Sequence, residues 1–255
     1  MKNKRLIVFF IVILALALLS IYYPKLTGNA TQTQVNYEKE TAILNRVLDG
    51  DTIEVTGPVI GNKTHIRLLG INTPEKKMPF SNESKVFLEQ FVNKTIQLER
   101  DKEDTDKYNR KLRYIYYENR FLNQEILELG LANSYYMDNL RYNVLLLNAE
   151  AQAKNLGVGI WTRSSDVCFS CIYLRELNAT QELFIIGNNC SFNCELSGWF
   201  VKDAGRNTFY LSSMNSNTER VFYSKNNTNV WNDEGDRLFI FDKKGYLVLF
   251  YEYKF

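Results

Sequence analysis

The chain has 255 residues, of which 45% are apolar and 24% are charged, and its formal net charge is +2. This length and composition suit a globular protein of one or two domains with a sizeable core. The nearly balanced charge argues against a protein that coats DNA by electrostatic attraction alone, so any polyanion must bind to a local basic patch.

The first residues have the pattern of a segment directed to a membrane. Three basic residues among the first five positions precede an apolar run from Leu6 to about Tyr23, and this charge keeps the N-terminus on the cytoplasmic side. The run, about 18 residues, is just long enough to span a bilayer. Aromatic residues follow it in place of a small-x-small cleavage site, which favours a transmembrane helix over a cleaved signal peptide. We expect an anchor or signal segment at 1–25 and a polar linker at 26–40. The rest is then membrane-anchored on the extracytoplasmic side, or secreted if the segment is cleaved.

The next part of the chain combines predicted strands and helices, as in an α+β domain. Thr41–Val55 is typical of a strand pair that turns near Asp49-Gly50. In the strand that follows, Arg67 would lie on the face opposite Ile66 and Leu68. Two further strands are expected at Thr95–Glu99 and Leu112–Tyr117. Helices are expected at about Ser84–Val92, from near Asn123 to the stop at Gly130, and at about Tyr142–Leu156.

After Trp161 the pattern changes to short β-rich runs separated by Asn, Gly and Ser. Strands at this spacing predict a β-sandwich, which we place at residues 163–255. The runs are Glu182–Ile186, Trp199–Lys202, Thr208–Leu211, Arg220–Tyr223, Arg237–Phe241 and Tyr246–Tyr253.

Three motifs gather acids, arginines and a glutamate into strand and turn segments. They are Val-Leu-Asp-Gly-Asp-Thr at 47–52, Ile-Arg-Leu-Leu-Gly-Ile-Asn-Thr-Pro-Glu at 66–75, and Asp-Lys-Tyr-Asn-Arg at 106–110. Hard cations prefer oxygen ligands, and a scissile phosphate needs positive charge and a nearby base. With the helix Asn-Ala-Glu-Ala-Gln-Ala-Lys at 148–154 that leads to Trp161, these motifs resemble the staphylococcal nuclease (thermonuclease) family.

The resemblance covers about residues 40–162, so we place the domain at 41–162. It implies a five-stranded OB-type barrel flanked by helices, and a Ca²⁺-dependent endonuclease that leaves 3′-phosphates. The implied catalytic residues are Arg67, Glu75 and Arg110, with Glu75 activating water and the arginines gripping phosphate. The implied calcium ligands are Asp51, Asn72 and the Thr73 carbonyl. Lys107, Tyr108 and Tyr136 would bind substrate, and Asp49 and Asp106 would support the ligands and arginines.

Asn72 departs from the family pattern, which has a carboxylate two residues before Pro-Glu. An amide oxygen still binds Ca²⁺, but one negative charge is lost, so we expect a weaker metal site and not an inactive enzyme.

The tail resembles a second family, the lamin-tail domains, which have an immunoglobulin-like fold. The resemblance rests on Glu-Leu-Phe-Ile-Ile-Gly-Asn-Asn at 182–189, Leu-Ser-Gly-Trp at 196–199 and Val-Trp-Asn-Asp-Glu-Gly-Asp at 230–236. These residues are structural, and none forms a catalytic set.

The cysteines and the single histidine narrow the chemistry further. The four cysteines, Cys168, Cys171, Cys190 and Cys194, fit either a tetrahedral zinc site or two disulfides, and an extracytoplasmic location favours disulfides. With one histidine, His65, a His-rich metal nuclease is excluded and a Ser-His-Asp triad is improbable.

The main hypothesis is an extracytoplasmic, membrane-tethered, calcium-dependent nuclease that hydrolyses DNA and RNA by attack of an activated water. The alternative is a non-catalytic nucleic-acid or protein-binding module on the same tether. A third is a surface adhesin whose tail binds the cell envelope. In each, the C-terminal domain has a ligand of its own.

Overall fold

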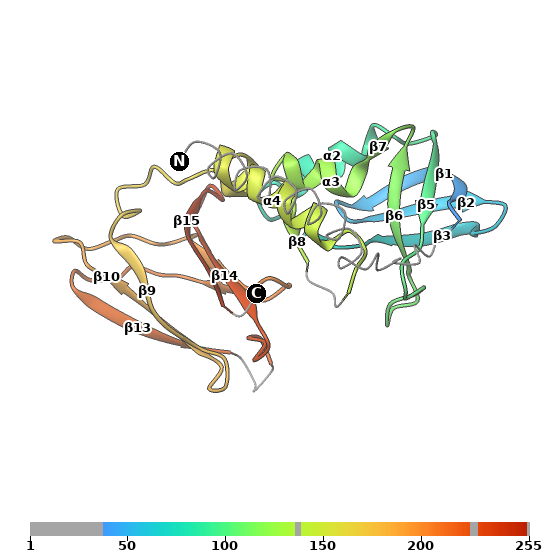
Figure 1. Ribbon diagram of the computed structural model, residues 1–255. Coiled ribbons are helices and arrows are strands. Elements are labelled where there is room, and N and C mark those ends of the chain that lie inside the picture. The colour runs from blue at the N-terminus through green and yellow to red at the C-terminus, as the bar shows by residue number, and fades with distance from the viewer. Residues whose placement is uncertain (1–37, 136–138, 225–228, 254–255) are drawn as a thin grey trace, which may run out of the picture. The chain divides into compact units, whose positions relative to one another are not determined.

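The computed structural model describes residues 38–135, 139–224 and 229–253, all within one unit, Tyr37–Phe255. The expected anchor, and the polar linker up to residue 37, lie outside the described residues. Among the helices that are described, none is both long and apolar enough to cross a bilayer. Figure 1 shows a strand barrel with helices beside it, followed along the chain by a second group of strands.

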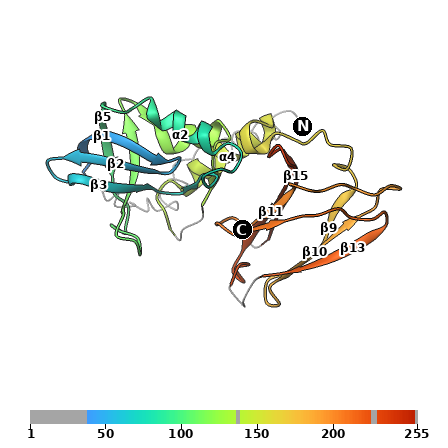
Figure 2. The same ribbon diagram turned by 180° about the vertical axis from the view of Figure 1, so that it is seen from behind.

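Five strands form the closed barrel that the family resemblance implies. They pair in the order β3-β2-β1-β5-β6, and β7 pairs with β6 at the edge. A parallel pairing between β3 and β6, in which Arg67 is the partner of Leu112, closes the barrel. Figure 2 shows β1, β2 and β3 from the opposite side. The bounds are β1 Glu40–Asp49, β2 Thr52–Gly57, β3 Gly61–Leu68, β5 Thr95–Glu99, β6 Lys111–Tyr117 and β7 Arg120–Phe121.

Alternation along the strands fills the barrel with apolar side chains. Leu44, Ile53, Ile66 and Leu98 are fully buried in one cluster. Arg67, between the buried Ile66 and Leu68, points away from this cluster because successive strand residues face opposite sides. The pattern that builds the core therefore also presents an arginine on the outer surface of the barrel.

Three helices flank the barrel. They are α2 Ser81–Glu89, α3 Leu122–Glu128 and α4 Asn143–Leu156. Gly130 and Gly157, with φ of 64° and 63°, follow α3 and α4 as predicted, because glycine adopts the left-handed conformation readily. Two short strands beside them, β4 Ile71–Asn72 and β8 Asn133–Ser134, pair with each other.

Helix α2 begins three residues before its predicted start. Phe80, at φ 64°, turns the chain into the helix, and Ser84 donates its hydroxyl to the carbonyls of Phe80 and Leu131 at 2.7 Å. Ser84 is therefore a buried residue inside the helix. Turns after Gln90 end the helix before the predicted Val92.

The C-terminal region is a two-layer β-sandwich, as predicted. The sheets have the orders β13-β10-β9 and β12-β11-β14-β15, and side chains of both, including Phe184, Val201 and Leu238, share one apolar cluster. The lamin-tail assignment remains a prediction. The bounds are β9 Ile172–Asn178, β10 Leu183–Asn188, β11 Phe200–Lys202, β12 Thr208–Tyr210, β13 Thr218–Tyr223, β14 Asp236–Phe241 and β15 Leu247–Tyr253.

The four cysteines form two disulfides and no zinc site. Cys168 pairs with Cys194, and Cys171 pairs with Cys190. Both bonds join the segment before β9 to the segment after β10. They cross-link the end of the sandwich where the chain arrives from the barrel domain.

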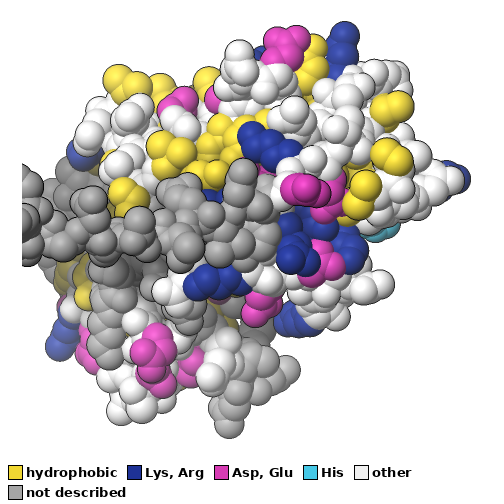
Figure 3. All heavy atoms as spheres, turned by 45° about the vertical axis from the view of Figure 1, so that its right-hand side comes forward, with side chains coloured by type: hydrophobic (Ala, Val, Ile, Leu, Met, Phe, Trp, Pro, Cys, Tyr) yellow, Lys and Arg dark blue, Asp and Glu magenta, His cyan; other side chains and the backbone are white. Residues whose placement is uncertain are grey.

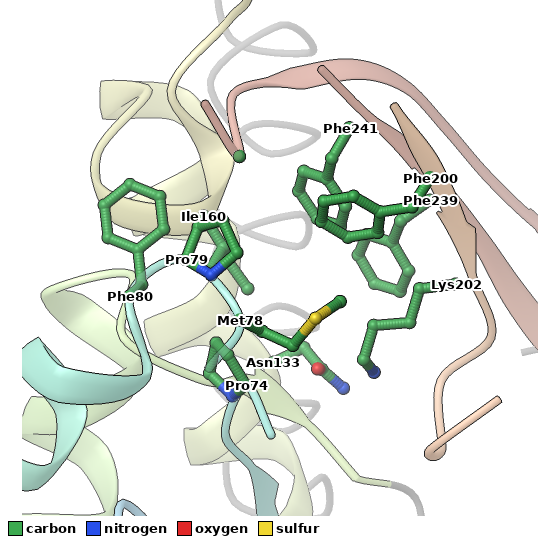
Figure 4. A pocket seen from close by; sticks show the side chains of 11 residues that line it. Pro74, Met78, Pro79, Phe80, Asn133, Ile160, Phe200, Lys202, Phe239 and Phe241 are labelled. Atoms are coloured by element: carbon green, nitrogen blue, oxygen red, sulfur yellow. The ribbon is translucent and has the colours of Figure 1, made fainter. Parts of the chain in front are cut away.

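The barrel domain and the sandwich contact each other through apolar and polar groups. Ala153, Ile160 and Trp161 pack with Phe200, Phe239 and Phe241 of the sandwich. Figure 4 shows the small cavity nearby, about 30 Å³, which Met78 and Pro79 of the barrel domain line together with Phe200 and Phe239. These contacts hold the β11–β12 loop of the sandwich beside the nuclease-like motifs.

Candidate active site

The turn between β1 and β2 places Asp51 at the site. Gly50 is required there, because a Cβ at this position would lie 2.5 Å from the Cβ of Ser84. Asp49 Oδ1 accepts the Asp51 N–H at 3.1 Å and so holds the turn. Burial, and then the negative charge of Asp51, raise the pKa of Asp49. The turn thus holds the buried carboxylate of Asp51 next to the more exposed carboxylate of Asp49.

Two oxygens converge on the guanidinium of Arg67. Its Nη2 lies 3.3 Å from Asp51 Oδ2 and 3.5 Å from Asn72 Oδ1. Thr73 lies beside them, because its N–H donates to Asp51 Oδ2 at 3.2 Å. The structure therefore brings Asp51, Asn72 and Thr73 together around one positive charge, although 21 residues separate Asp51 from Asn72.

Arg110 reaches the same turn from the loop before β6. Its Nη1 donates to Thr52 Oγ1 at 3.2 Å, and that hydroxyl donates to Asp51 Oδ1 at 3.0 Å. Asp106 holds Arg110 through Nε at 2.7 Å. Burial raises the pKa of Asp106, but the Arg110 N–H and guanidinium outweigh burial and bring it below its ordinary value. Arg67 and Arg110 are thus both linked to the turn at Asp51 and Thr52.

Glu75 lies in the loop between β4 and α2, two residues after Thr73. Its side chain is 44% exposed, and its Oε1 is 2.9 Å from Nε of Arg206, in the sandwich. A half-exposed carboxylate has the access to water that a general base needs.

Of the three predicted substrate residues, Lys107 lines a groove that Arg206, the partner of Glu75, also lines. Lys107, Tyr135, Asp203 and Arg206 are among its lining residues, and its volume is about 1130 Å³. Tyr108, next to Lys107, is 62% exposed. Tyr136 lies outside the described residues. In Figure 3 the basic side chains on this face lie in small groups among acidic ones.

The donor set suits a hard cation such as Ca²⁺. Asp51 and Asn72 each bring a side-chain oxygen to the Arg67 guanidinium, and oxygen is the ligand type that hard cations prefer. In the part of the chain that the structure describes, the one group of three His, Cys, Asp or Glu side chains placed to share a metal is Cys168, Cys190 and Cys194, and all three are in disulfides. Among the described residues, then, no three such side chains at the Asp51 turn are placed to share a metal, and the weaker calcium site expected from Asn72 remains a prediction.

Comparisons with known proteins decide the family. A family model, the staphylococcal nuclease homologue, matches residues 65–163. A thermonuclease of Staphylococcus hyicus is 30% identical over 161 residues, which cover 60% of this chain and 94% of that protein. The chain belongs to the staphylococcal nuclease family. A thermonuclease of Staphylococcus intermedius is 28% identical over 163 residues, covering 60% of this chain and 96% of its own. An uncharacterized endonuclease of Haemophilus influenzae is 32% identical over 132 residues, which cover 51% of this chain and 71% of that protein.

The protein is therefore a nuclease, and the family model places residues 65–163 in its nuclease domain. The match to the family model ends at residue 163, so it does not cover the sandwich. His65 plays no part in the site: it is a half-exposed residue of β3, 3.5 Å from Glu54.

Sequence analysis missed the sandwich residues at the nuclease site. Arg206 lies in a polar turn, Asp-Ala-Gly-Arg-Asn, that has no catalytic motif and is 131 residues from Glu75. Lys202 reads as an ordinary strand lysine, yet its side chain is buried, and burial lowers its pKa despite the nearby charges of Asp203 and Glu75. The sequence holds no signal that would have placed either residue near the nuclease motifs.

The same loop gives a pH prediction for stability. Burial raises the pKa of Asp203 to about 6, against hydrogen bonds from Asn207 and the charge of Lys202, and Asp236 raises it further. The folded state therefore binds the proton of the Asp203 carboxyl more tightly than the unfolded state does. Protonation of Asp203 stabilises the fold most below about pH 4, where the carboxyl is protonated in both states. The effect is lost as the pH rises through about 6. Between pH 4.5 and 7.5 we expect the unfolding free energy of the wild type to fall by about 2 kcal/mol relative to that of Asp203→Asn.

Guanidinium unfolding of both proteins at several pH values measures this loss. A difference between the two unfolding free energies that stays constant from pH 4.5 to 7.5 would contradict the prediction.

Proposed function

We propose that the protein is a calcium-dependent nuclease that hydrolyses phosphodiester bonds of DNA and RNA outside the cytoplasm. The observation that carries the proposal is the convergence of Arg67 and Arg110 on the turn at Asp51 and Thr52. Two arginines held at one turn, Arg67 at the Asp51 carboxylate and Arg110 at the Thr52 hydroxyl, form a site for a tetrahedral anion beside a metal ligand.

In the proposed reaction, Glu75 accepts a proton from water, and the resulting hydroxide oxygen bonds to phosphorus. The phosphorus–oxygen bond to the leaving nucleoside then breaks, and that oxygen is protonated. Arg67 and Arg110 donate hydrogen bonds to the phosphoryl oxygens, where negative charge increases toward the transition state. Calcium bound by Asp51, Asn72 and Thr73 would neutralise part of the same charge. The exposed ring of Tyr108 and the ammonium of Lys107 bind the neighbouring nucleotide.

The location outside the cytoplasm is supported by the two disulfides. Such bonds persist in oxidising compartments and are rare in the cytosol. The basic, apolar N-terminal sequence supports the same location, with a membrane anchor or a cleaved signal segment.

One experiment separates the nuclease from a binding module. Fluorescently labelled DNA and RNA oligonucleotides are incubated with the full chain and calcium, with binding followed by anisotropy and cleavage by gel. We expect shortened products from both nucleic acids. Binding of either one without any cleavage would contradict the proposal and favour the binding module.

Replacing Asn72 with aspartate tests the metal site. The change adds a charge to an oxygen that faces the Arg67 guanidinium, and calcium affinity rises with the charge of the ligands. We expect the calcium concentration for half-maximal cleavage to fall about tenfold, which corresponds to about 1.4 kcal/mol.

Asn72→Ser is the matched control, because it removes the amide without adding charge, and it should raise the half-maximal calcium concentration. An unchanged calcium midpoint in Asn72→Asp would show that residue 72 is not a ligand.

A further inference from the structure

The β11–β12 loop of the sandwich, residues 203–207, contacts the nuclease site at two points. The Asn72 side-chain amide donates to the carbonyls of Ala204, at 2.9 Å, and Gly205, at 3.4 Å. The Arg206 guanidinium pairs with Glu75 through Nε at 2.9 Å. One loop thus contacts both a proposed metal ligand and the proposed base.

Hydrogen bonds within the loop, and others from the adjoining strands β11 and β14, hold the loop in its conformation. The ammonium of Lys202 donates to the carbonyls of Asp203, at 3.0 Å, and Gly205, at 2.6 Å. The Asn207 N–H donates to Asp203 Oδ1 at 2.9 Å, and the Ala204 N–H donates to Asp236 Oδ1 at 3.2 Å. Burying a lysine costs free energy, which these two carbonyl contacts offset. These bonds attach the loop to the sheet that carries it, so the loop supports Arg206 from the sandwich.

The amide at residue 72 suits this contact better than a carboxylate. An ionised carboxylate has no proton to donate, and it would face the oxygens of Ala204 and Gly205 with like partial charge. The contact with the sandwich thus accounts for the amide at residue 72. A carboxylate would add a negative charge to the metal site, but the amide donates two hydrogen bonds to the loop.

The ion pair between Arg206 and Glu75 contributes little to stability. The two side chains are 59% and 44% exposed, and exposed pairs are worth about 0–1 kcal/mol. Its larger effect is on the orientation of Glu75, since an exposed glutamate otherwise samples several rotamers. A reacting group displaced by about 1 Å can cost about 100-fold in rate.

We propose that Arg206 is a positioning residue of the nuclease site, which holds the Glu75 carboxylate in place for the attacking water. This inference rests on the proposed function of Glu75. If Arg206 has this role, the sandwich contributes to the nuclease site, because its loop at 203–207 carries the Arg206 guanidinium. Arg206 also lines the groove that Lys107 lines, so its charge faces the path of a polyanionic substrate.

The test is steady-state DNA cleavage by the full chain with calcium, for the wild type, Arg206→Ala and Arg206→Lys. Arg175→Ala is the matched control, since Arg175 is also an exposed sandwich arginine paired with a glutamate. We expect kcat to fall about 10- to 100-fold in Arg206→Ala with KM changed less than threefold, and Arg206→Lys to recover most of the loss. Arg175→Ala should match the wild type.

A double variant separates positioning from a general structural role. If Arg206 acts through Glu75, Arg206→Ala should lower kcat no further when Glu75 is already glutamine. Wild-type rates in Arg206→Ala, a rise in kcat, or an equal loss in both backgrounds would each overturn the inference while leaving the proposed function standing. Absence of cleavage by the wild type would overturn both.

Discussion

Replacing Glu75 with glutamine is expected to lower kcat for DNA hydrolysis by a factor of about 10²–10⁴. Glutamine has nearly the shape of glutamate but cannot accept the proton of the attacking water. Because Arg67, Arg110 and Asp51 are untouched, the KM for DNA and the calcium midpoint should change little. The variant should unfold at the wild-type temperature, since Glu75 is half exposed and contributes little to the core.

The control for this prediction is Glu83→Gln. Glu83 is an exposed residue in the first turn of α2, so its replacement makes the same chemical change away from the arginines. We expect wild-type kcat from the control. A rate for Glu75→Gln within about threefold of the wild type would exclude Glu75 as the base.

Replacing Arg237 with methionine is expected to destabilise the protein by about 3–5 kcal/mol, the usual cost of removing one partner of a buried ion pair. The Arg237 guanidinium, in β14, lies 2.9 Å from Glu150 Oε1 of α4, and both side chains are about 2% exposed. It also donates to Ser134 Oγ and to the Ser134 carbonyl, each at 3.0 Å. Methionine fills part of the volume but leaves the Glu150 carboxylate buried without the guanidinium.

Urea unfolding of Arg237→Met measures this loss, with Arg175→Met as the exposed control, for which about 0–1 kcal/mol is expected. The double variant Arg237→Met with Glu150→Gln should recover part of the stability, because it no longer buries an uncompensated charge. A loss under 1 kcal/mol in Arg237→Met would show that Lys154, 3.2 Å from Glu150, suffices to compensate this carboxylate.

Local patterns predicted most strands and helices of the barrel domain, whereas the barrel itself was expected from the family resemblance. Thr95–Glu99 is found with its predicted bounds, because its alternating side chains face the core and the solvent in turn. The turn after Asp49 and the helix ends at Gly130 and Gly157 also match, since each depends on residues within a few positions. The strand Ile172–Asn178 was not predicted, and a register shift opposite Ile185-Ile186 interrupts its pairing with β10.

The grouping of Asp51, Arg67, Asn72, Thr73 and Arg110 was expected only through the family resemblance. Spacing along the chain does not show that the β3–β6 pairing carries the loop with Arg110 to Thr52. The roles of these residues remain predictions.

Contacts between the sandwich and the barrel domain were beyond sequence analysis. Arg206 meets Glu75, and Arg237 meets Glu150, across 131 and 87 positions of the chain. Such pairs depend on how two separately folded regions pack, and no local pattern encodes that packing. The sequence therefore predicted the sandwich as a separate domain, whereas in the structure its loop at 203–207 contacts Asn72 and Glu75.

The most direct test of the account is the initial rate of DNA hydrolysis by the purified full chain as calcium is added back after chelation. The account predicts no cleavage with the chelator present and a saturable recovery with a midpoint of about 10⁻⁴–10⁻³ M, as for weak calcium sites outside cells. Cleavage at the same rate in the chelator and in millimolar calcium would contradict it.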